Sequence, residues 1–416
     1  MGVKAGGDST DGTGVFRRHV LYIPGYDPFP PRRYRELYRS EGAAQAAISG
    51  YRLAIQPRGG ETYGWHVAAQ IEGREVEAEE EVLVWSDLVQ RSMAQGIAAT
   101  YLQLIRTAWA YIGYGALFRL MRLRKGPMIA ALYPILFLIA QAVLALLVFL
   151  YAAKAVAWAW LRLIEPGPLG QGVAILVGLV AGWLLLRGFR ALDHRIFAYY
   201  LMHDYAFTAA LKGENPPALE DRMAKFRARV RAALERDLDE VLVVGHSSGV
   251  HLAVSILADL IREGLPARRP ALGFLSLGQV VPMVSFLPKA GRLRGDLAYL
   301  SMREELTWVD VSAPGDGCSF ALCDPVAVSG VALPGQRWPL VISAAFSQTL
   351  SVEKWQALRR RYFRLHFQYL CAFDRPGDYD YFRITAGPLT LAARFRGRKP
   401  SSSRIATALS PFRDVA

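Results

Sequence analysis

The pentapeptide Gly245-His246-Ser247-Ser248-Gly249 is the part of this chain whose residue types and spacing point most directly to chemistry. It has the form G-x-S-x-G, in which a serine at the tip of a sharp strand-to-helix turn exposes its hydroxyl. The flanks supply both elements: residues 239–244 end in four consecutive Val and Leu residues, and apolar residues between 252 and 261 recur at spacings of one, three and four. Glycines beside the serine let the strand and the helix pass close together. We therefore interpret Ser247 as a candidate nucleophile.

A serine hydroxyl needs a base that removes its proton, and histidine is the usual base. Of the seven histidines, four precede the motif, His246 lies inside it, and His251 lies on the helix that follows it. His366 is the remaining candidate for the chain order serine, acid, histidine. It follows residues 363–365, which we predict to be the last strand of a sheet.

The third member of such a triad is a carboxylate that orients the imidazole. Residues 306–311 predict a strand, and Asp316 lies in the turn just past its end. Asp324, which is followed by a proline, is the alternative acid. Asp310 is a third possibility, but it lies within the strand pattern and would project from the sheet instead of from its tip.

The regions around these residues alternate between strands and helices. Before the uncharged segments described below, residues 19–23, 51–55, 65–71 and 82–85 are strand candidates, and a helix begins near residue 32. After the serine motif, residues 272–280 and 306–311 are further strands. This alternation predicts an α/β fold with a mostly parallel sheet in three layers.

With these residues identified, the chain resembles the α/β-hydrolase superfamily over about residues 15–95 and 205–390. The resemblance implies an oxyanion hole formed by the amide of Ser248 and an amide from Gly25 or Tyr26, in the loop after the first strand. The chain departs from the family at Ile23-Pro24-Gly25, where many members have His-Gly. It also carries an uncharged insertion where a soluble lid is usual.

Two long uncharged runs interrupt the hydrolase-like sequence. Residues 126–153 contain 28 residues without a charge, and residues 166–186 contain 21. Each is long enough to cross a bilayer as a helix, for which about 20 residues suffice. The joint between them, residues 165–168, contains two prolines and a glycine and breaks any helix. We predict a transmembrane hairpin with spans of about 128–153 and 167–187, preceded by an interfacial helix over residues 97–121.

Basic residues flank the two spans on the sides away from the joint: Arg119, Arg122, Arg124 and Lys125 before the first, and Arg187, Arg190 and Arg195 after the second. The positive-inside rule therefore predicts an integral membrane protein, of the inner membrane if bacterial, whose catalytic domain is cytoplasmic. The formal net charge of +13 is explained by attraction to anionic lipid headgroups, because no nucleic-acid motif accompanies it. Three cysteines in that compartment predict free thiols, and their spacing predicts no metal site or other cofactor.

These patterns divide the chain into a disordered N-terminus (1–14), a first hydrolase segment (15–95), an interfacial helix and hairpin (96–205), a second hydrolase segment (206–395) and a basic C-terminal tail (396–416). They predict a membrane-anchored serine hydrolase that cleaves an ester or thioester, of a lipid or another acyl compound, through an acyl-enzyme. The expected partners are membrane lipids and an amphiphilic substrate. An acyltransferase with the same triad, or a catalytically silent membrane scaffold, is the alternative. The sequence leaves the oligomeric state open.

Overall fold

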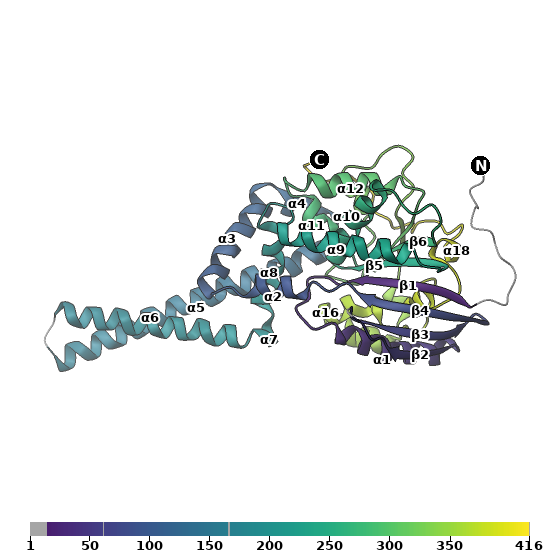
Figure 1. Ribbon diagram of the computed structural model, residues 1–416. Helices are drawn as coiled ribbons and strands as arrows, with labels where there is room; N and C mark the ends of the chain where they lie inside the picture. The colour runs from purple at the N-terminus through teal and green to yellow at the C-terminus, as the bar shows by residue number, and fades with distance from the viewer. Residues whose placement is uncertain (1–14, 61, 165–166, 416) are drawn as a thin grey trace.

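The computed structural model describes residues 15–60, 62–164 and 167–415, so the expected disordered segment 1–14 lies outside the described residues. An eight-stranded sheet forms its centre, in the order β2-β3-β4-β1-β5-β6-β7-β8 (Figure 1). The strands are β1 (Phe16–Ile23), β2 (Arg52–Pro57), β3 (Gly64–Ile71), β4 (Arg74–Val82), β5 (Glu240–His246), β6 (Ala271–Leu277), β7 (Thr307–Ser312) and β8 (Leu340–Ser343). All neighbouring strands from β4 to β8 are parallel, and β2-β3 and β3-β4 are antiparallel. The predicted α/β class with a mostly parallel sheet is confirmed.

Helices pack on both faces of the sheet because its central strands are apolar on both sides. Leu242 and Val244 join one buried cluster, whereas Val241 and Val243, which alternate with them along β5, join another. The helices outside the region 96–210 are α1 (Arg32–Ser49), α2 (Ser86–Met93), α9 (Pro217–Leu234), α10 (Gly249–Arg262), α11 (Val281–Ser285), α12 (Gly291–Ser301), α13 (Pro325–Val328), α14 (Phe346–Thr349), α15 (Val352–Leu358), α16 (Tyr362–His366), η1 (Phe367–Leu370), α17 (Tyr381–Thr385) and α18 (Leu391–Arg394). The first cluster includes α1 and the second includes α9, α10 and α12.

The fourth strand differs from the prediction. We expected a strand at residues 82–85, but β4 runs from Arg74 to Val82 through a segment rich in glutamate. Such a segment would normally remain solvated. Here Glu81 is fully buried and accepts hydrogen bonds from Arg58 and Arg229, at 3.2 and 2.9 Å. Pairing with arginines from other elements allows the charged strand to enter the sheet.

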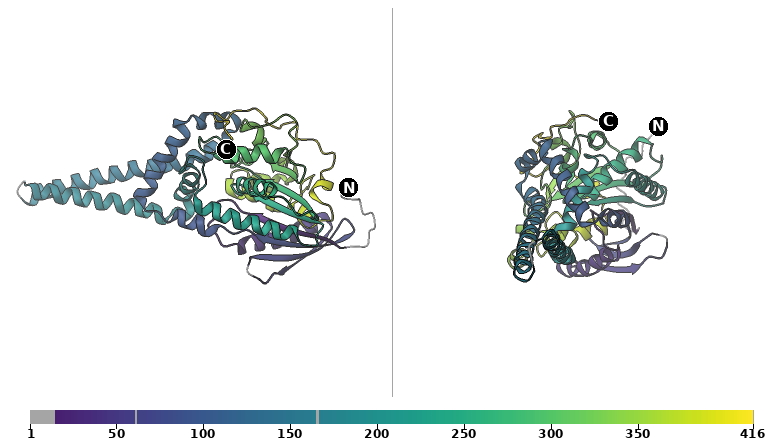
Figure 2. Two further views of the ribbon diagram at one scale, coloured as in Figure 1. Left: turned by 45° about the horizontal axis from the view of Figure 1, so that its top comes forward. Right: turned by 90° about the vertical axis from the view of Figure 1, so that its left-hand side faces the viewer.

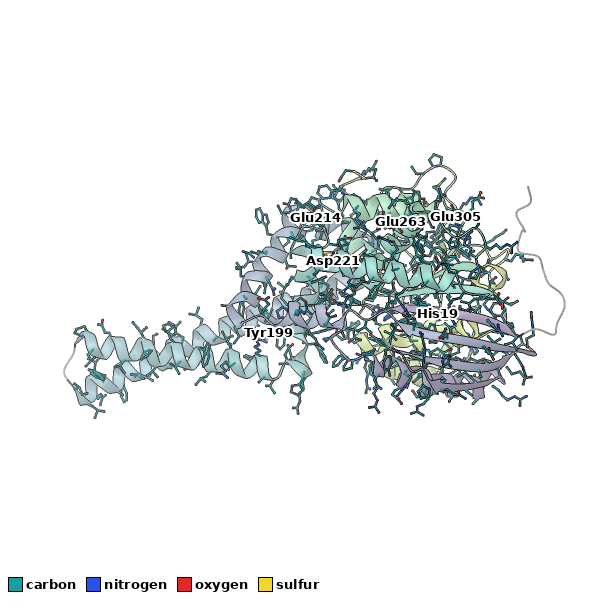
Figure 3. All side chains as sticks on the ribbon, viewed as in Figure 1. His19, Tyr199, Glu214, Asp221, Glu263 and Glu305 are labelled. Atoms are coloured by element: carbon teal, nitrogen blue, oxygen red, sulfur yellow. The ribbon has the colours of Figure 1, made fainter. Side chains whose placement is uncertain are left out.

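A long helical arm projects from one end of the domain. It consists of α5 (Lys125–Leu163) and α6 (Pro168–Ala191), which lie antiparallel and extend well beyond the sheet in Figure 1 and in the left-hand view of Figure 2. Both helices are long and apolar enough to cross a membrane. In the most apolar 18-residue stretch of each helix, only 17% (α5) and 22% (α6) of the stretch is buried. In Figure 3, side chains project from both helices along the whole length of the arm, and the labelled Tyr199 lies near its base.

Small residues allow the two helices of the arm to pack closely. Gly170, Ala174, Gly178 and Gly182 are the buried residues of α6 and recur at every fourth position. A Cβ atom at Gly178 would lie 2.7 Å from the carbonyl oxygen of Phe149 on α5, closer than real Cβ contacts. Close approach through small residues at this spacing is typical of helix pairs within membranes.

The two uncharged runs are staggered along the arm. Gly178 packs against Ala153 and Phe149, and Gly182 packs against Ala145. Lys154, which ends the first run, therefore lies beside the middle of α6, about 14 Å from the tip end of α5. The first part of the expected span 128–153 packs against the domain, with Met128, Ala131 and Leu138 buried. The side chain of Lys154 is exposed, and a lysine at such a depth can extend its ammonium group toward a membrane surface.

The base of the arm is formed by the first part of α5 together with α3 (Ile97–Gly113), α4 (Ala116–Leu123), α7 (Asp193–Ile196) and α8 (Ala198–Ala209). The expected single helix over residues 97–121 is thus broken into α3 and α4 at Gly115, which has a φ of +68°. The exposed residues Leu102, Ile105, Trp109 and Ile112 follow one stripe of α3. This apolar outer stripe agrees with the predicted interfacial character.

The C-terminal segment is attached to the domain. The amide of Ser401 donates to Val341 O at 2.8 Å, and Ile405 forms a bridge with Cys323. Near the end of the chain, Asp414 pairs with the buried Arg294 at 2.7 Å. Residues 396–415, which belong to the predicted basic C-terminal tail, therefore pack against the domain.

Candidate active site

The serine motif forms the strained turn that its sequence predicts. Ser247 connects β5 to α10 and has a φ of +56°, a backbone conformation that is costly for a residue with a side chain. The two glycines are required by close contacts: a Cβ at Gly245 would lie 2.9 Å from Val250 Cα, and one at Gly249 would lie 2.2 Å from Ile23 O. The fold therefore holds Ser247 at the tip of the turn, where it is half-buried.

The turn lies where the topology favours a site. In the sheet, β1 pairs with β4 on one side and with β5 on the other, and the chain forms the strands on the β4 side before it forms those on the β5 side. The carboxyl ends of β1 and β5 therefore flank a switch point, where ligands of open α/β sheets bind. The loop after β1 does approach the serine: a Cβ at Gly25 would lie 3.0 Å from Ser247 Cβ.

The predicted oxyanion hole uses the amide of Ser248 and an amide from Gly25 or Tyr26. Of these, the Tyr26 amide already has a hydrogen-bond acceptor. The amide of Tyr26 donates a 2.8 Å hydrogen bond to the side-chain oxygen of Ser248. This bond fixes the loop after β1 against the serine turn. It also occupies the Tyr26 amide, so a substrate oxyanion would have to replace Ser248 Oγ as the acceptor.

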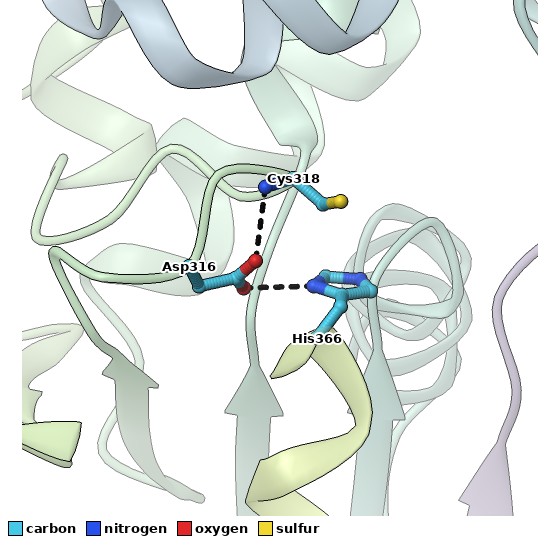
Figure 4. Close-up of side chains that lie close together, drawn as sticks. All are labelled: Asp316, Cys318 and His366. Atoms are coloured by element: carbon cyan, nitrogen blue, oxygen red, sulfur yellow. Dashed lines mark hydrogen bonds and ion pairs between the residues drawn. The ribbon is translucent and has the colours of Figure 1, made fainter. Parts of the chain in front are cut away.

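His366 lies on helix α16, and the strand expected at residues 363–365 is absent from this described segment. Its Nδ1 atom is 2.7 Å from Oδ2 of Asp316 (Figure 4). Its Nε2 atom is buried and has no hydrogen-bond partner among the residues that the structure describes. The imidazole is thus held by Asp316 on one side and has a free nitrogen on the other, as a general base requires.

Asp316 is held as a carboxylate by several donors. Its Oδ1 accepts from the Cys318 amide at 2.9 Å, and its Oδ2 accepts from the Tyr369 hydroxyl at 3.0 Å as well as from His366. Burial alone would raise the pKa of Asp316, but the charge of His366 and these hydrogen bonds outweigh burial and lower it. An ionised acceptor fixes the Nδ1-H tautomer of His366. Nothing in the sequence near Tyr369 marks this role.

His246, inside the serine motif, supports the backbone of the base. Its Nε2 atom donates to the carbonyl oxygen of His366 at 3.0 Å, and the two ring centroids are 4.8 Å apart. Burial, assisted by the charge of His366, lowers the pKa of His246 to about 3. His246 therefore stays neutral and acts as a structural donor.

The serine turn and the imidazole meet at the end of β6. The amide of Ser247 donates to Leu277 O at 2.9 Å. At the next residue, a Cβ on Gly278 would lie 3.0 Å from Cε1 of His366, the ring atom beside the free Nε2. Ser247 and His366 therefore approach two consecutive residues, Leu277 and Gly278, and Nε2 has no hydrogen bond to Ser247 in this described region.

The two alternative acids lie in other environments. Asp324 caps α13 by accepting from the amides of Val326 and Ala327, at 3.0 and 3.1 Å, and its other oxygen accepts from Gln336. Asp310 is fully buried within β7 and accepts from Ser276 Oγ at 2.6 Å. Asp316 is the acid that contacts His366.

Asp310 gives a prediction about stability. Burial raises its pKa to about 7, assisted by the charge of Asp324 and opposed by the bond from Ser276. The folded state keeps a proton on Asp310 that the unfolded state loses near pH 4, so stability falls as the pH rises from about 4 to about 7. We expect Asp310→Asn to raise the melting temperature in detergent relative to the parent at pH 8, and clearly less at pH 5. The exposed Asp237→Asn is the control, and an equal difference at both pH values would contradict the assignment.

Among the described residues, Asp316, Cys318 and His366 also form a group that could ligate a metal, with ligand atoms within 4.8 Å of one another. Two of these atoms already share the 2.7 Å hydrogen bond between Asp316 and His366. Burial, followed by the charges of Asp316 and Asp204, raises the pKa of the Cys318 thiol, so it is not prepared as a thiolate ligand. The geometry is that of a hydrogen-bonded aspartate-histidine pair with a thiol beside it.

The base of the arm contacts three segments around the candidate site: the loop after β7, helix α16 and the loop after β1. Arg124, just before α5, donates to Ala321 O in the loop after β7 at 2.7 Å, and a Cβ at Gly126 would lie 3.1 Å from Gly317. Beyond α6, the ring of Phe197 lies 5.8 Å from that of Phe363 on α16. The hydroxyl of Tyr200 donates to Tyr26 O at 2.6 Å. The arm is thus built into the candidate site.

Comparison of the chain with protein-family models, with curated proteins and with solved structures gives no match.

Proposed function

We propose that the protein is a membrane-anchored serine hydrolase with an α/β-hydrolase-like, three-layer domain, acting on an ester or thioester of a lipid or another acyl compound. One observation carries the proposal: Ser247 stands at a φ of +56° on a strand-to-helix turn beside a buried Asp316-His366 pair. Strained conformations of this kind persist where the surrounding fold enforces them, and they cluster at active sites. The free Nε2 of His366 supplies the base that such a serine needs.

In the proposed reaction, Ser247 Oγ attacks the substrate carbonyl carbon while its proton passes to Nε2 of His366. The amide of Ser248 and an amide of the loop at Gly25 and Tyr26 stabilise the resulting oxyanion. The bond to the leaving alcohol or thiol then breaks, and His366 returns the proton to the departing atom. Water attacks the acyl-enzyme with His366 again as base, which releases the acid and restores Ser247.

The apolar surface of the arm supports a membrane location. Large exposed side chains cover both helices, including Leu146, Leu150, Leu176 and Leu179. A continuous apolar surface of this length would be unfavourable in water, and it fits a bilayer. Arginines lie over indoles near the tip and near the base of the arm, Arg162 over Trp158 at 4.8 Å and Arg187 over Trp183 at 4.7 Å. Such pairs suit the two interfaces of a membrane.

The arm also supports the choice of an amphiphilic substrate. Its base touches the loops of Tyr26, Gly317 and Phe363, so a bilayer around the arm would place the candidate site close to the lipid surface. A lipid or acyl ester could then reach Ser247 without dissolving fully in water. The arginine and lysine side chains at the base of the arm would attract anionic headgroups and hold the domain there.

The basic flanks predict that the domain is cytoplasmic and that the tip of the arm is outside. A cysteine introduced at Gly167, beside the tip, is expected to react in intact cells with a maleimide that does not cross membranes. A cysteine at the exposed Ser402 is expected to react only after permeabilisation. The native cysteines give a low background because burial raises their pKa. Labelling of Ser402→Cys from outside, or extraction of the protein by alkaline carbonate, would contradict this topology.

Labelling with a fluorophosphonate tests the proposed function directly. We expect the purified protein in detergent to be labelled at Ser247, and to hydrolyse p-nitrophenyl butyrate. Labelling with no hydrolysis, but with transfer of the butyryl group to an added alcohol, would identify an acyltransferase. A protein that is not labelled at all would be a catalytically silent scaffold, and the proposal would be wrong.

A further inference from the structure

Asp204 lies on the face of α8 that faces the candidate site. In a helix, residues 200, 204 and 207 share one face. The first and last of these contact the loop after β1: Tyr200 donates to Tyr26 O at 2.6 Å, and the ring of Phe207 lies 5.5 Å from that of Tyr26. Asp204 lies between them. Its carboxyl group is therefore directed toward the loop that borders Ser247.

Within residues 15–60, 62–164 and 167–415, no side chain or amide bonds to the carboxyl group of Asp204; the Thr208 hydroxyl donates instead to its backbone carbonyl oxygen. By contrast, Asp27 in the loop after β1 accepts from the Phe29 amide and pairs with Arg33, at 3.0 Å each. Burial raises the pKa of Asp204 to about 7, although the charge of His366 lowers it. The Asp204 side chain is half-buried, and no described residue donates a hydrogen bond to its carboxyl group, which leaves that group available to a ligand.

The carboxyl group is close enough to the candidate site to act on its members. Three causes raise the pKa of the Cys318 thiol: burial is the largest, the charge of Asp316 comes second and the charge of Asp204 third. After burial, it is also the largest influence that raises the pKa of the Tyr200 hydroxyl. Asp204 is thus near Tyr200, which bonds to the loop of Tyr26, and near Cys318, whose amide bonds to Asp316.

The neighbouring residue faces an apolar space. Tyr205 lines a cavity of about 30 Å³ between α3, α5 and the domain, together with Met128, Ile135 and Met283. Its exposed lining is entirely apolar. Two consecutive residues of α8, Asp204 and Tyr205, therefore lie between the candidate site and a small apolar space beside the arm.

We propose that Asp204 binds a hydrogen-bond donor, a hydroxyl or a protonated amine, on the alcohol portion of the ester that Ser247 cleaves. This inference rests on the proposed function and names its substrate class. Above pH 7 the ionised form of Asp204 predominates, and a carboxylate accepts hydrogen bonds only, so the group that it would bind there is a donor. The donor would satisfy Asp204 only when substrate is bound, which allows discrimination against esters of plain alkyl alcohols.

Two pairs of butyrate esters of equal shape test the proposal. 2-(Dimethylamino)ethyl butyrate carries a protonated amine where 3-methylbutyl butyrate carries a carbon, and 2-hydroxyethyl butyrate carries a hydroxyl where propyl butyrate carries a methyl group. We expect kcat/KM to favour at least one donor ester over its match, by about tenfold or more for the amine and about fivefold for the hydroxyl. Asp204→Leu should bring both ratios close to one. Asp204→Asn, which keeps a carbonyl acceptor, should lose the amine preference and keep most of a hydroxyl preference.

Each ratio compares two esters on the same protein, so partial unfolding of a variant lowers kcat/KM for both esters alike and leaves their ratio unchanged. Asp221→Asn, which removes an exposed carboxylate from α9, is the control and should keep the parental ratios. Ratios near one in the parent, or unchanged ratios in Asp204→Leu, would overturn the role of Asp204 while labelling of Ser247 by fluorophosphonate persists. Loss of that labelling in the parent would instead overturn the proposed function.

Discussion

Ser247→Ala is expected to lower kcat for p-nitrophenyl butyrate by about 10⁴- to 10⁶-fold and to abolish fluorophosphonate labelling. The alanine lacks the oxygen that forms the acyl-enzyme, and no other described side chain lies at the tip of the β5-α10 turn. Because alanine also removes a polar group from a half-buried position without enlarging the side chain, the fold should be retained. The control is Ser402→Ala, an exposed serine of the C-terminal segment, which should keep parental activity.

The double variant Ser247→Ala with His366→Ala gives the sharper form of this prediction. If the two residues act as a unit, the double variant should be little slower than either single variant. Independent contributions would instead multiply, and the double variant would be slower by the product of the two effects. A multiplicative result, or parental activity in Ser247→Ala, would remove Ser247 and His366 from a common mechanism.

The sequence was sufficient for the serine turn because its signal is local. The apolar residues of β5, the glycine spacing and the periodicity of α10 lie within about 25 consecutive residues, and each of them reports on a conformation that forms within that stretch. The order serine, acid, histidine then left few candidates, and Asp316 and His366 do lie in contact. Both uncharged runs are helices of the arm for the same local reason.

Features that depend on distant partners were missed. Residues 74–82 look solvated until Arg58 and Arg229 are placed beside Glu81. Residues 363–365 are too short to show a period, and their alternating apolar and charged side chains suggested a strand where the chain forms α16. The stagger of the arm follows from contacts of Gly178 and Gly182 with α5, which no pattern within either helix reveals.

The supporting residues of the site are the hardest to predict. Tyr369 reaches Asp316 from η1, and His246 reaches the carbonyl of His366 across 120 residues of sequence. Asp204 belongs to a helix whose pattern is that of an ordinary apolar helix. Each of these residues gains its role from the three-dimensional neighbourhood alone, whereas the nucleophile is marked by the turn that it must occupy.

Asp316→Asn is expected to lower kcat by about 10⁴-fold, because the change reverses the polarity of one hydrogen bond. The Cys318 amide donates to Oδ1, so the asparagine oxygen must remain there and its NH₂ group must face His366. An NH₂ group can only donate, which forces Nδ1 of His366 to accept and moves the ring proton to Nε2. The nitrogen that should take the proton of Ser247 is then already protonated.

Asp324→Asn is the matched comparison, because it makes the same chemical change in an acid of the same loop region. Asparagine caps helices as well as aspartate does, so the bonds from the amides of Val326 and Ala327 should survive. We expect less than a fivefold loss of kcat, since Asp324 does not contact His366. A larger loss in Asp324→Asn than in Asp316→Asn would mean that the loop rearranges to place Asp324 at the imidazole, and the acid would then have to be reassigned.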